Sequence, residues 1–293
     1  MVCGMFNSEI AVMAMVAFAL TACSDGENAM SISPDEWSSL NNIAVEGHVT
    51  RRSSAFDVDH SKVLRRATAN GSIVRMSELD SVTLDTTGVF FYSRCDGSTG
   101  EFSFDGVTLR SPYVKLELAP DRNNEGKNEI WSFDVFDANK DRYVIVYTAI
   151  VDLRESRNVD INAFTYLESF RMHRLVHLGH GAAKAKSLAE HEILDAVGLS
   201  DESYNFDKRE LVNDQNHLIA NKVVYNLIYE WSADASPLML ANTFANKASF
   251  ATTDLVKEFF IDEMNKWKAV YSARNDTAKF MDRFIATLSS LKE

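Results

Sequence analysis

Hydrophobic and polar residues alternate in short runs along the first half of the chain. The clearest run is Tyr113-Val114-Lys115-Leu116-Glu117-Leu118, in which every second residue is aliphatic. A period of two is typical of a β-strand with one buried face. Turn sequences such as Asn70-Gly71 and Asp105-Gly106 separate the runs, and their spacing favours a small β-sandwich of about seven or eight strands over 44–156. The predicted strands lie within 45–49, 73–79, 88–92, 101–104, 113–118, 131–136 and 142–151.

The hydrophobic period becomes helical from about residue 159 to the end of the sequence. Ala182, Ala185, Ala189 and Ile193 recur at spacings of three and four, which predicts one apolar face. Gly198 then fits the position after a helix end, with Leu199 packing back in a Schellman motif. The other predicted helices have apolar faces at Phe164, Leu167, Leu175 and Leu178, along 208–231, within 256–267 and within 281–291.

Strands followed by helices, rather than alternating with them, indicate an α+β fold. A chain of 293 residues is long enough for about two domains. We therefore expect a β-sandwich domain over 44–156 and an all-α helical bundle over 157–293.

The N-terminal segment has the features of an export signal. Residues 10–20 form an apolar run of IAVMAMVAFAL, which ends in Leu20-Thr21-Ala22-Cys23. This ending resembles the bacterial lipobox, which implies removal of a signal peptide over 1–22 and acylation of Cys23 with a thioether diacylglycerol and an amide-linked acyl chain. The first nine residues contain no Lys or Arg, whereas export signals normally begin with positive charge. An ordinary signal peptide cut near Ala22 and a buried N-terminal helix are the alternatives.

The residues after Cys23 are polar and predict a tether over 23–43 that joins the anchor to the fold. Several acyl chains on one residue hold a protein at a bilayer without a spanning helix. Ser24 resembles the residue that accompanies transfer to the outer membrane, and the sequence leaves open whether the protein faces the periplasm or the exterior.

The net charge of −12 argues against a nucleic-acid partner, because phosphate binding requires clustered Lys and Arg. Outside residues 1–22 no apolar run approaches the length of a membrane-spanning helix. The expected partners are the lipid bilayer and, through the folded part, a polysaccharide or a protein.

Several segments together resemble a large paralogous family of surface lipoproteins from fibre-degrading gut bacteria. The resemblance covers 71–199 and implies a carboxypeptidase-regulatory, prealbumin-like β-sandwich followed by helices; it implies no assigned activity. An early Cys-rich segment of the family is missing, and Tyr166 stands where the family has His. The matching segments are GSIVRMSELD at 71–80, GEFSF at 100–104, VTLRSPY at 107–113, VDINAFTYLE at 159–168, AKAK at 183–186, EIL at 192–194 and VGL at 197–199.

The VDINAFTYLE segment predicts a corner between a strand and the first helix. Asn158 or Asp160 is expected to cap that helix through its side-chain oxygen. Thr165 and Glu168 then lie three residues apart on the helix. We expect a structural junction between the β part and the helical part, with a binding pocket at the same corner as the alternative; its predicted residues are Asp160, Asn162, Thr165 and Glu168.

Two groups of residues are weak candidates for metal binding, and we expect neither a metal nor another cofactor. His173 and His177 are four residues apart and could share an ion, but a third ligand and the metalloprotease Glu are missing from the motif. Surface histidines are the favoured interpretation. Asp137, Asn139 and Asp141 match the beginning of a calcium-binding loop, but the Gly and the final Glu of such a loop are missing. A charged hairpin turn explains the same residues equally well.

No set of residues predicts a catalytic site. The sequence has no G-x-S-x-G elbow and no phosphate-binding glycine loop. Cys95 lies in a strand pattern and is expected to be an unreactive buried thiol. We therefore expect a membrane-anchored, non-enzymatic structural or interaction module. A carbohydrate-binding accessory to plant-polysaccharide breakdown is the alternative, and a hydrolase with a site at the domain junction comes third.

Overall fold

The computed structural model describes the part of the chain that contains most of the predicted strands and helices. All of it belongs to one compact unit, Trp37–Glu293. The predicted signal peptide over 1–22, Cys23 and the metal candidates Asp137, Asn139 and Asp141 lie outside the described residues. The described residues are 39–49, 72–96, 99–120, 134–136, 142–144, 147–200, 205–207, 221, 224, 237–250, 254–271 and 275–290.

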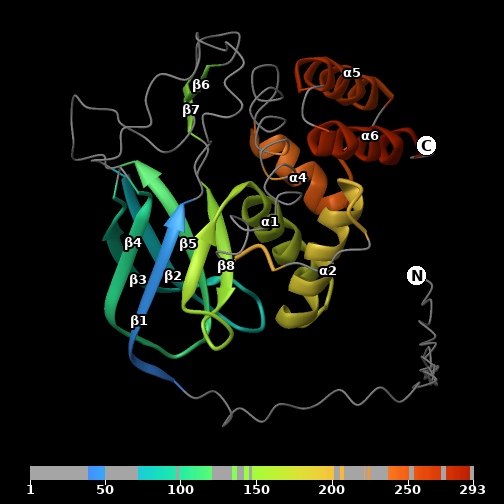
Figure 1. The fold of residues 1–293 in the computed structure, drawn as a ribbon. Helices are drawn as coiled ribbons and strands as arrows, with labels where there is room; N and C mark the ends of the chain where they lie inside the picture. The colour runs from blue at the N-terminus through green and yellow to red at the C-terminus, as the bar shows by residue number, and fades with distance from the viewer. Residues whose placement is uncertain are drawn as a thin grey trace, which may run out of the picture. The chain divides into compact units, whose positions relative to one another are not determined.

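The strands form two larger sheets and one short pair (Figure 1). The four-stranded sheet has the order β3 (Thr86–Arg94), β2 (Ser72–Leu79), β5 (Tyr113–Pro120), β8 (Thr148–Asp152), and all its neighbours are antiparallel. The three-stranded sheet has the order β4 (Glu101–Leu109), β1 (Leu40–Val49), β9 (Asn158–Ile161). β1 runs antiparallel to β4 and parallel to β9. β6 (Asp134–Phe136) pairs with β7 (Arg142–Val144).

One face of each larger sheet contributes to the same apolar core. In β4 the alternation buries Phe102 and Phe104. Met76 and Leu116, which lie opposite each other on β2 and β5, come from the other sheet. The period of two in the sequence therefore fixed which side chains face inward.

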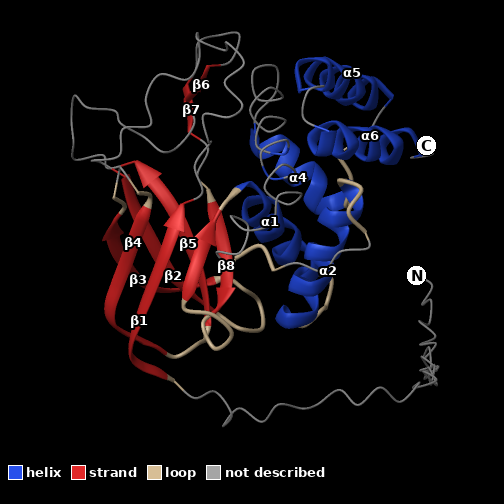
Figure 2. Ribbon diagram, in the orientation of Figure 1, coloured by secondary structure: helices blue, strands red, loops and turns tan. Residues whose placement is uncertain are grey.

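The described helices are α1 (Ala163–His177), α2 (Ala182–Ala196), α4 (Pro237–Lys247), α5 (Asp254–Tyr271) and α6 (Asn275–Ser290) (Figure 2). The outer face of the four-stranded sheet contributes Leu79, Tyr113 and Ile150 to a second apolar cluster. Met172 and Leu175 of α1 belong to that cluster, so α1 covers part of this face.

The main core continues from the strands into the helices. Val45 of β1 belongs to the same buried cluster as Phe244 of α4, Phe260 of α5 and Phe284 of α6. The predicted boundary between a domain at 44–156 and a domain at 157–293 therefore lies inside one compact unit with a shared core. The fold is α+β, and among the described residues the strands precede the helices.

Two strand boundaries differ from the predicted ones. The tether was predicted to extend to residue 43, but β1 begins at Leu40, because Leu40 pairs with Leu109 across the sheet. The strand predicted over 142–151 is two strands that belong to different sheets, β7 and β8.

The helical region also begins later than predicted and contains an additional helix. Residues 158–161 form β9 instead of the start of a helix, because they pair with β1. Leu178 was placed on the apolar face of the first helix, but it follows the last helical residue and is 57% exposed. α4 was not predicted, and of the predicted helix over 208–231 only Asn221 and Val224 lie within the described residues, both helical.

The end of α2 has the predicted Schellman geometry. Gly198 has a φ of +77°, Leu199 N–H donates to Leu194 O at 2.8 Å, and Gly198 N–H donates to Asp195 O at 3.1 Å. A Cβ on Gly198 would stand 2.9 Å from Thr287 Oγ1 of α6. Glycine is required here both by the positive φ and by the close approach of α6.

Candidate functional site

The corner between β9 and α1 is built by Asn162. Its Oδ1 accepts hydrogen bonds from Phe164 N–H at 2.9 Å and Thr165 N–H at 3.0 Å. Thr165 Oγ1 accepts in return from Asn162 N–H at 2.9 Å, which completes a capping box. The prediction that Asn158 or Asp160 caps this helix is wrong, because both residues lie within β9.

Asp160 links this corner to β1 and to the segment 205–207. It is fully buried, and its Oδ1 lies 3.0 Å from Nδ1 of His48. Its Oδ2 accepts from Asn162 Nδ2 at 3.2 Å, and Asn162 Nδ2 also donates to Phe206 O at 2.8 Å. Asp160 N–H donates to Asp207 O at 2.7 Å. Three parts of the chain that are far apart in sequence, β1, the β9–α1 corner and the segment 205–207, are thus joined by polar contacts.

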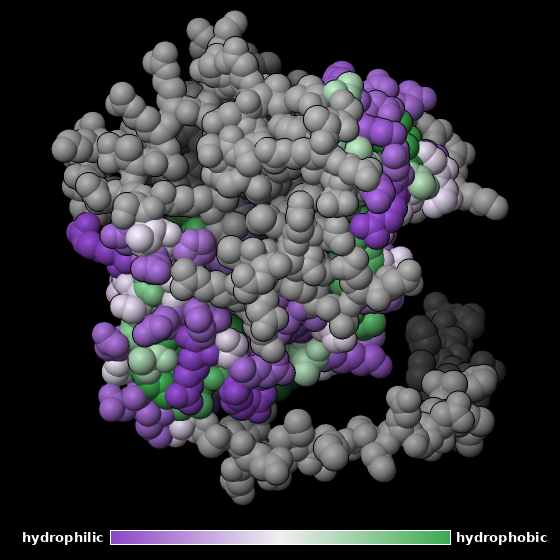
Figure 3. Space-filling view, viewed as in Figure 1, coloured by the Kyte–Doolittle hydropathy of each residue, from purple (hydrophilic) through white to green (hydrophobic). Residues whose placement is uncertain are grey.

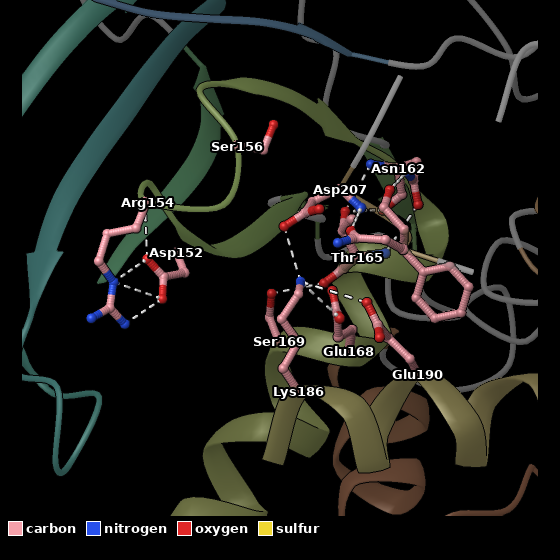
Figure 4. Close-up of polar contacts among 12 residues, drawn as sticks. Asp152, Arg154, Ser156, Asn162, Thr165, Glu168, Ser169, Lys186, Glu190 and Asp207 are labelled. Carbon is pink, nitrogen blue, oxygen red and sulfur yellow. Dashed lines mark hydrogen bonds and ion pairs between the residues drawn. The ribbon is translucent and has the colours of Figure 1, made fainter. Parts of the chain in front are cut away.

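Behind the corner lies a charge cluster, which we define as Glu168, Lys186, Glu190 and Asp207; Glu190 is half-buried and the other three are buried. Figure 4 shows Lys186 extending from α2 toward the three carboxylates. Its Nζ donates to Glu168 Oε1 at 3.1 Å and to Asp207 Oδ2 at 2.9 Å, and it lies 3.8 Å from Glu190 Oε1. Glu168 Oε2 and Asp207 Oδ1 are buried without a hydrogen-bond partner among the described residues.

The cluster places one cation among three carboxylates, and the pKa values respond to that imbalance. Burial raises the pKa of Glu168 well above its usual value, against the opposing effect of Lys186. Burial also raises the pKa of Glu190 to about 7, against Lys186 and with a contribution from Asp207. Burial alone would lower the pKa of Lys186, but the carboxylates outweigh burial and raise it. The cluster therefore holds Lys186 charged and takes up a proton near neutral pH.

A second ion pair connects three helices. Arg171 of α1 donates to Glu192 of α2, Nη2 to Oε1 at 2.8 Å, and to the backbone oxygen of Ala245 in α4 at 2.6 Å. Together with the charge cluster, it fixes how α1, α2 and α4 pack. Of the carboxylates at this junction, Glu168 and Asp207 are buried, whereas Glu190 and Glu192 are half-buried.

The structure brings all four predicted junction residues together, with partners that the sequence analysis missed. Asp160, Asn162 and Thr165 form the corner, and Glu168 belongs to the charge cluster. Lys186 was missed although it lies four residues after Ala182, on the apolar face of its helix. A charged residue at that position requires a buried partner. His48, Glu190 and Asp207 had no such signal, because only the fold places them at the corner.

Cys95, predicted to be a buried thiol, and the histidine pair His173 and His177 both lie within the described residues. Cys95 is buried, and its Sγ donates to Gly100 O at 3.4 Å. His173 and His177 lie on one side of α1, with their Nε2 atoms 3.3 Å apart. Asp85, which precedes β3, lies beside them, with Oδ1 at 3.6 Å from His173 Nε2. Burial and the neighbouring His177 lower the pKa of His173, which favours its neutral form.

A further surface feature lies on the outer face of the four-stranded sheet. We call it the β3 ledge and define it as Arg75, Phe90, Tyr92, Lys115 and Glu117. Elsewhere too, on the face of the molecule that Figure 3 shows, hydrophobic residues reach the surface among hydrophilic ones over the strand-rich part of the fold.

In the β3 ledge, aromatic and charged side chains lie side by side. Phe90 and Tyr92 are 47% and 64% exposed and pair with Ser77 and Arg75 across the sheet, so both rings lie on one face. Glu117 accepts from Arg75 Nε at 3.0 Å, and Lys115 Nζ lies 2.8 Å from its other oxygen. β3 is an edge strand of its sheet.

No family model, curated protein or solved structure matches this chain. Among the described residues, no helix has both the length and the apolar character needed to cross a membrane.

Proposed function

We propose that this protein is a bacterial lipoprotein, held at the outer membrane through acylated Cys23, with a non-enzymatic binding role on the periplasmic or extracellular face. The anchor is supported by the apolar run and the Leu20–Cys23 motif. The proposed architecture is a prealbumin-like β-sandwich followed by a helical bundle. Two sheets that share one core, with helices following the strands, support it.

The β3 ledge carries the proposal of a binding role. Large apolar side chains that lie together on an exposed face and are rimmed by polar residues mark binding surfaces. Phe90 and Tyr92 provide such a face, and Arg75 and Glu117 beside them can form hydrogen bonds with a bound ligand.

A polysaccharide is the second, more specific candidate for the ligand. Sugar rings have apolar C–H faces that pack on aromatic rings, and their hydroxyl groups form hydrogen bonds with charged side chains. Phe90 and Tyr92 are two residues apart on one strand and so project from the same face. This observation favours a polysaccharide over a ligand that is recognised by charge alone.

Retention of the full chain on insoluble polysaccharides tests the binding role. We expect the wild-type protein to be retained, and Phe90→Ser with Tyr92→Ser to reduce retention at least about tenfold, the effect expected of aromatic residues at the centre of an interface. Leu178→Ser is the matched control, because Leu178 is equally exposed but lies after α1. If the wild-type protein is retained on no fibre, a polysaccharide is ruled out as the ligand. If Leu178→Ser reduces retention as much as the double substitution does, the β3 ledge is ruled out as the binding surface.

Metabolic labelling with an alkyne fatty acid tests the anchor separately. We expect label on the wild-type protein and none on Cys23→Ser. Cys3→Ser serves as the control, because Cys3 lies within the proposed signal peptide and its loss should leave labelling unchanged. A wild-type protein that takes up no label would contradict the proposed location.

A further inference from the structure

We propose that Asp85, His173 and His177 form a surface site for one zinc-type divalent metal ion. Each residue offers one ligand atom, and the three atoms lie within 4.8 Å of one another. The segment around the histidine pair contains no third ligand, and Asp85, in the turn before β3 and 88 positions before His173, supplies one.

The distances suit a tetrahedral ion. Two ligand atoms bound at about 2.05 Å with a tetrahedral angle stand about 3.3 Å apart. The two Nε2 atoms of His173 and His177 are separated by 3.3 Å, and Asp85 Oδ1 is 3.6 Å from His173 Nε2. An ion could therefore enter with only small rotations of the side chains.

The site is held in place from both sides. His173 and His177 project from one side of α1, whose buried residues Met172 and Val176 pack beneath them. Leu84, directly before Asp85, is buried in the same apolar cluster and has a φ of +59°, which a leucine adopts only when its surroundings require it. The buried Leu84 thus fixes the turn against α1 and brings Asp85 to the histidines.

The hydrogen bonds of the turn add to this rigidity. Asp80 N–H donates to Asp85 O at 2.8 Å, and Leu84 N–H donates to Asp80 O at 2.7 Å. Asp80 Oδ1 accepts from Val82 N–H and from Thr83 N–H, both at 2.9 Å. Metal binding would therefore require little ordering of the chain.

The ligand types identify the class of ion. Two imidazole nitrogens and one carboxylate oxygen suit zinc and related transition metals, whereas calcium and magnesium prefer oxygen ligands alone. All three residues are at least partly exposed, so water can occupy a fourth position.

Calorimetric titration of the full chain with Zn²⁺ tests the proposal. We expect one equivalent to bind, and Asp85→Asn and His177→Gln each to weaken binding by at least about tenfold, since even the loss of an outer-shell partner has an effect of 10–100-fold. Titration with Ca²⁺ should give no binding. Without metal, both variants should have the wild-type Tm, which separates loss of the site from loss of the fold.

His191→Gln is the matched control. His191 is exposed and lies 3.4 Å from Asp195 on the same helix, so it forms a His–carboxylate pair without a second histidine. We expect this variant to bind Zn²⁺ as the wild type does. The proposal is overturned if the wild type binds no Zn²⁺, if His191→Gln loses as much affinity as His177→Gln, or if Asp85→Asn binds as tightly as the wild type.

Discussion

Lys186 on α2 and Asp207 in the segment 205–207 form a buried ion pair, with Nζ and Oδ2 2.9 Å apart. Because Asp207 O also accepts from the backbone of Asp160, this pair connects α2 to the strand that precedes α1. A buried ion pair adds little stability over an apolar pair, but its partners depend on each other. The charge cluster therefore specifies one arrangement of these elements.

Removing the cation of the charge cluster should destabilise the fold strongly. Lys186→Met keeps the length of the side chain but leaves Glu168 and Asp207 without their donor. We expect the free energy of unfolding to fall by about 3–5 kcal/mol, measured by urea denaturation. Lys184→Met, on the exposed side of the same helix, should change it by less than about 0.5 kcal/mol. Equal effects of the two substitutions would contradict the role of Lys186.

The charge cluster should also make stability depend on pH. The pKa of Glu190 is raised from 4.5 to about 7 in the folded protein, so the folded state binds more protons than the unfolded state between these values. A raised carboxyl pKa contributes stability that is present below the unfolded pKa and is lost as pH rises through the folded pKa. Stability should therefore decrease from about pH 5 to about pH 8, by on the order of 2 kcal/mol.

Glu190→Gln isolates this contribution, because glutamine does not titrate. Urea denaturation across the same pH range should show a shallower decrease in the variant than in the wild type. Glu258→Gln, at an exposed position of α5, should retain the wild-type slope. A variant Glu190→Gln with the wild-type slope would place the titrating group elsewhere.

The cap of α1 can be tested at Asn162, which follows β9, and at Asn158, the first residue of β9. Asn162→Ala removes the acceptor for Phe164 and Thr165 and the donor to Phe206 O, all of them buried. We expect a loss of about 2–3 kcal/mol in the free energy of unfolding. Asn158→Ala changes an exposed residue and should cost less than about 0.5 kcal/mol. The reverse order would restore the predicted cap at Asn158.

Alanine substitutions at two glycines with positive φ separate the cost of backbone strain from the cost of a steric clash between the new Cβ and α6. Gly179→Ala introduces a Cβ into open space at a φ of +95° and should cost about 1–2 kcal/mol from the backbone alone. Gly198→Ala meets Thr287 and the backbone of Arg283 in addition. We expect its cost to reach about 2–4 kcal/mol, measured by thermal unfolding. Similar values for both would show that α6 moves aside freely.

The features that could be predicted from sequence are those that depend on neighbouring residues. Ala182, Ala185, Ala189 and Ile193 are buried as their spacing predicts, because a helix places residues three and four apart on one face. Gly198 was predicted because a left-handed residue at a helix end favours glycine.

The features that could not be predicted depend on contacts between distant segments. Residues 158–161 carry no local preference that distinguishes them from the start of a helix, and their pairing with β1 makes them a strand. The first helix was assigned one apolar face, yet every residue from Ala163 to Ser169 is buried, since strands and other helices surround it. For the same reason Asp85 could not be joined to the histidine pair.

The parallel pairing of β1 with β9 has a consequence for the order in which the protein can be assembled. His48 and Asp160, which face each other in that pairing, are 112 positions apart. While the polypeptide is being synthesised, the edge of β1 that pairs with β9 therefore has unpaired backbone N–H and C=O groups until residues 158–161 have been made. A nascent chain would need to be kept from aggregating through this exposed edge of β1. The strand that finally pairs with it, β9, leads directly into α1.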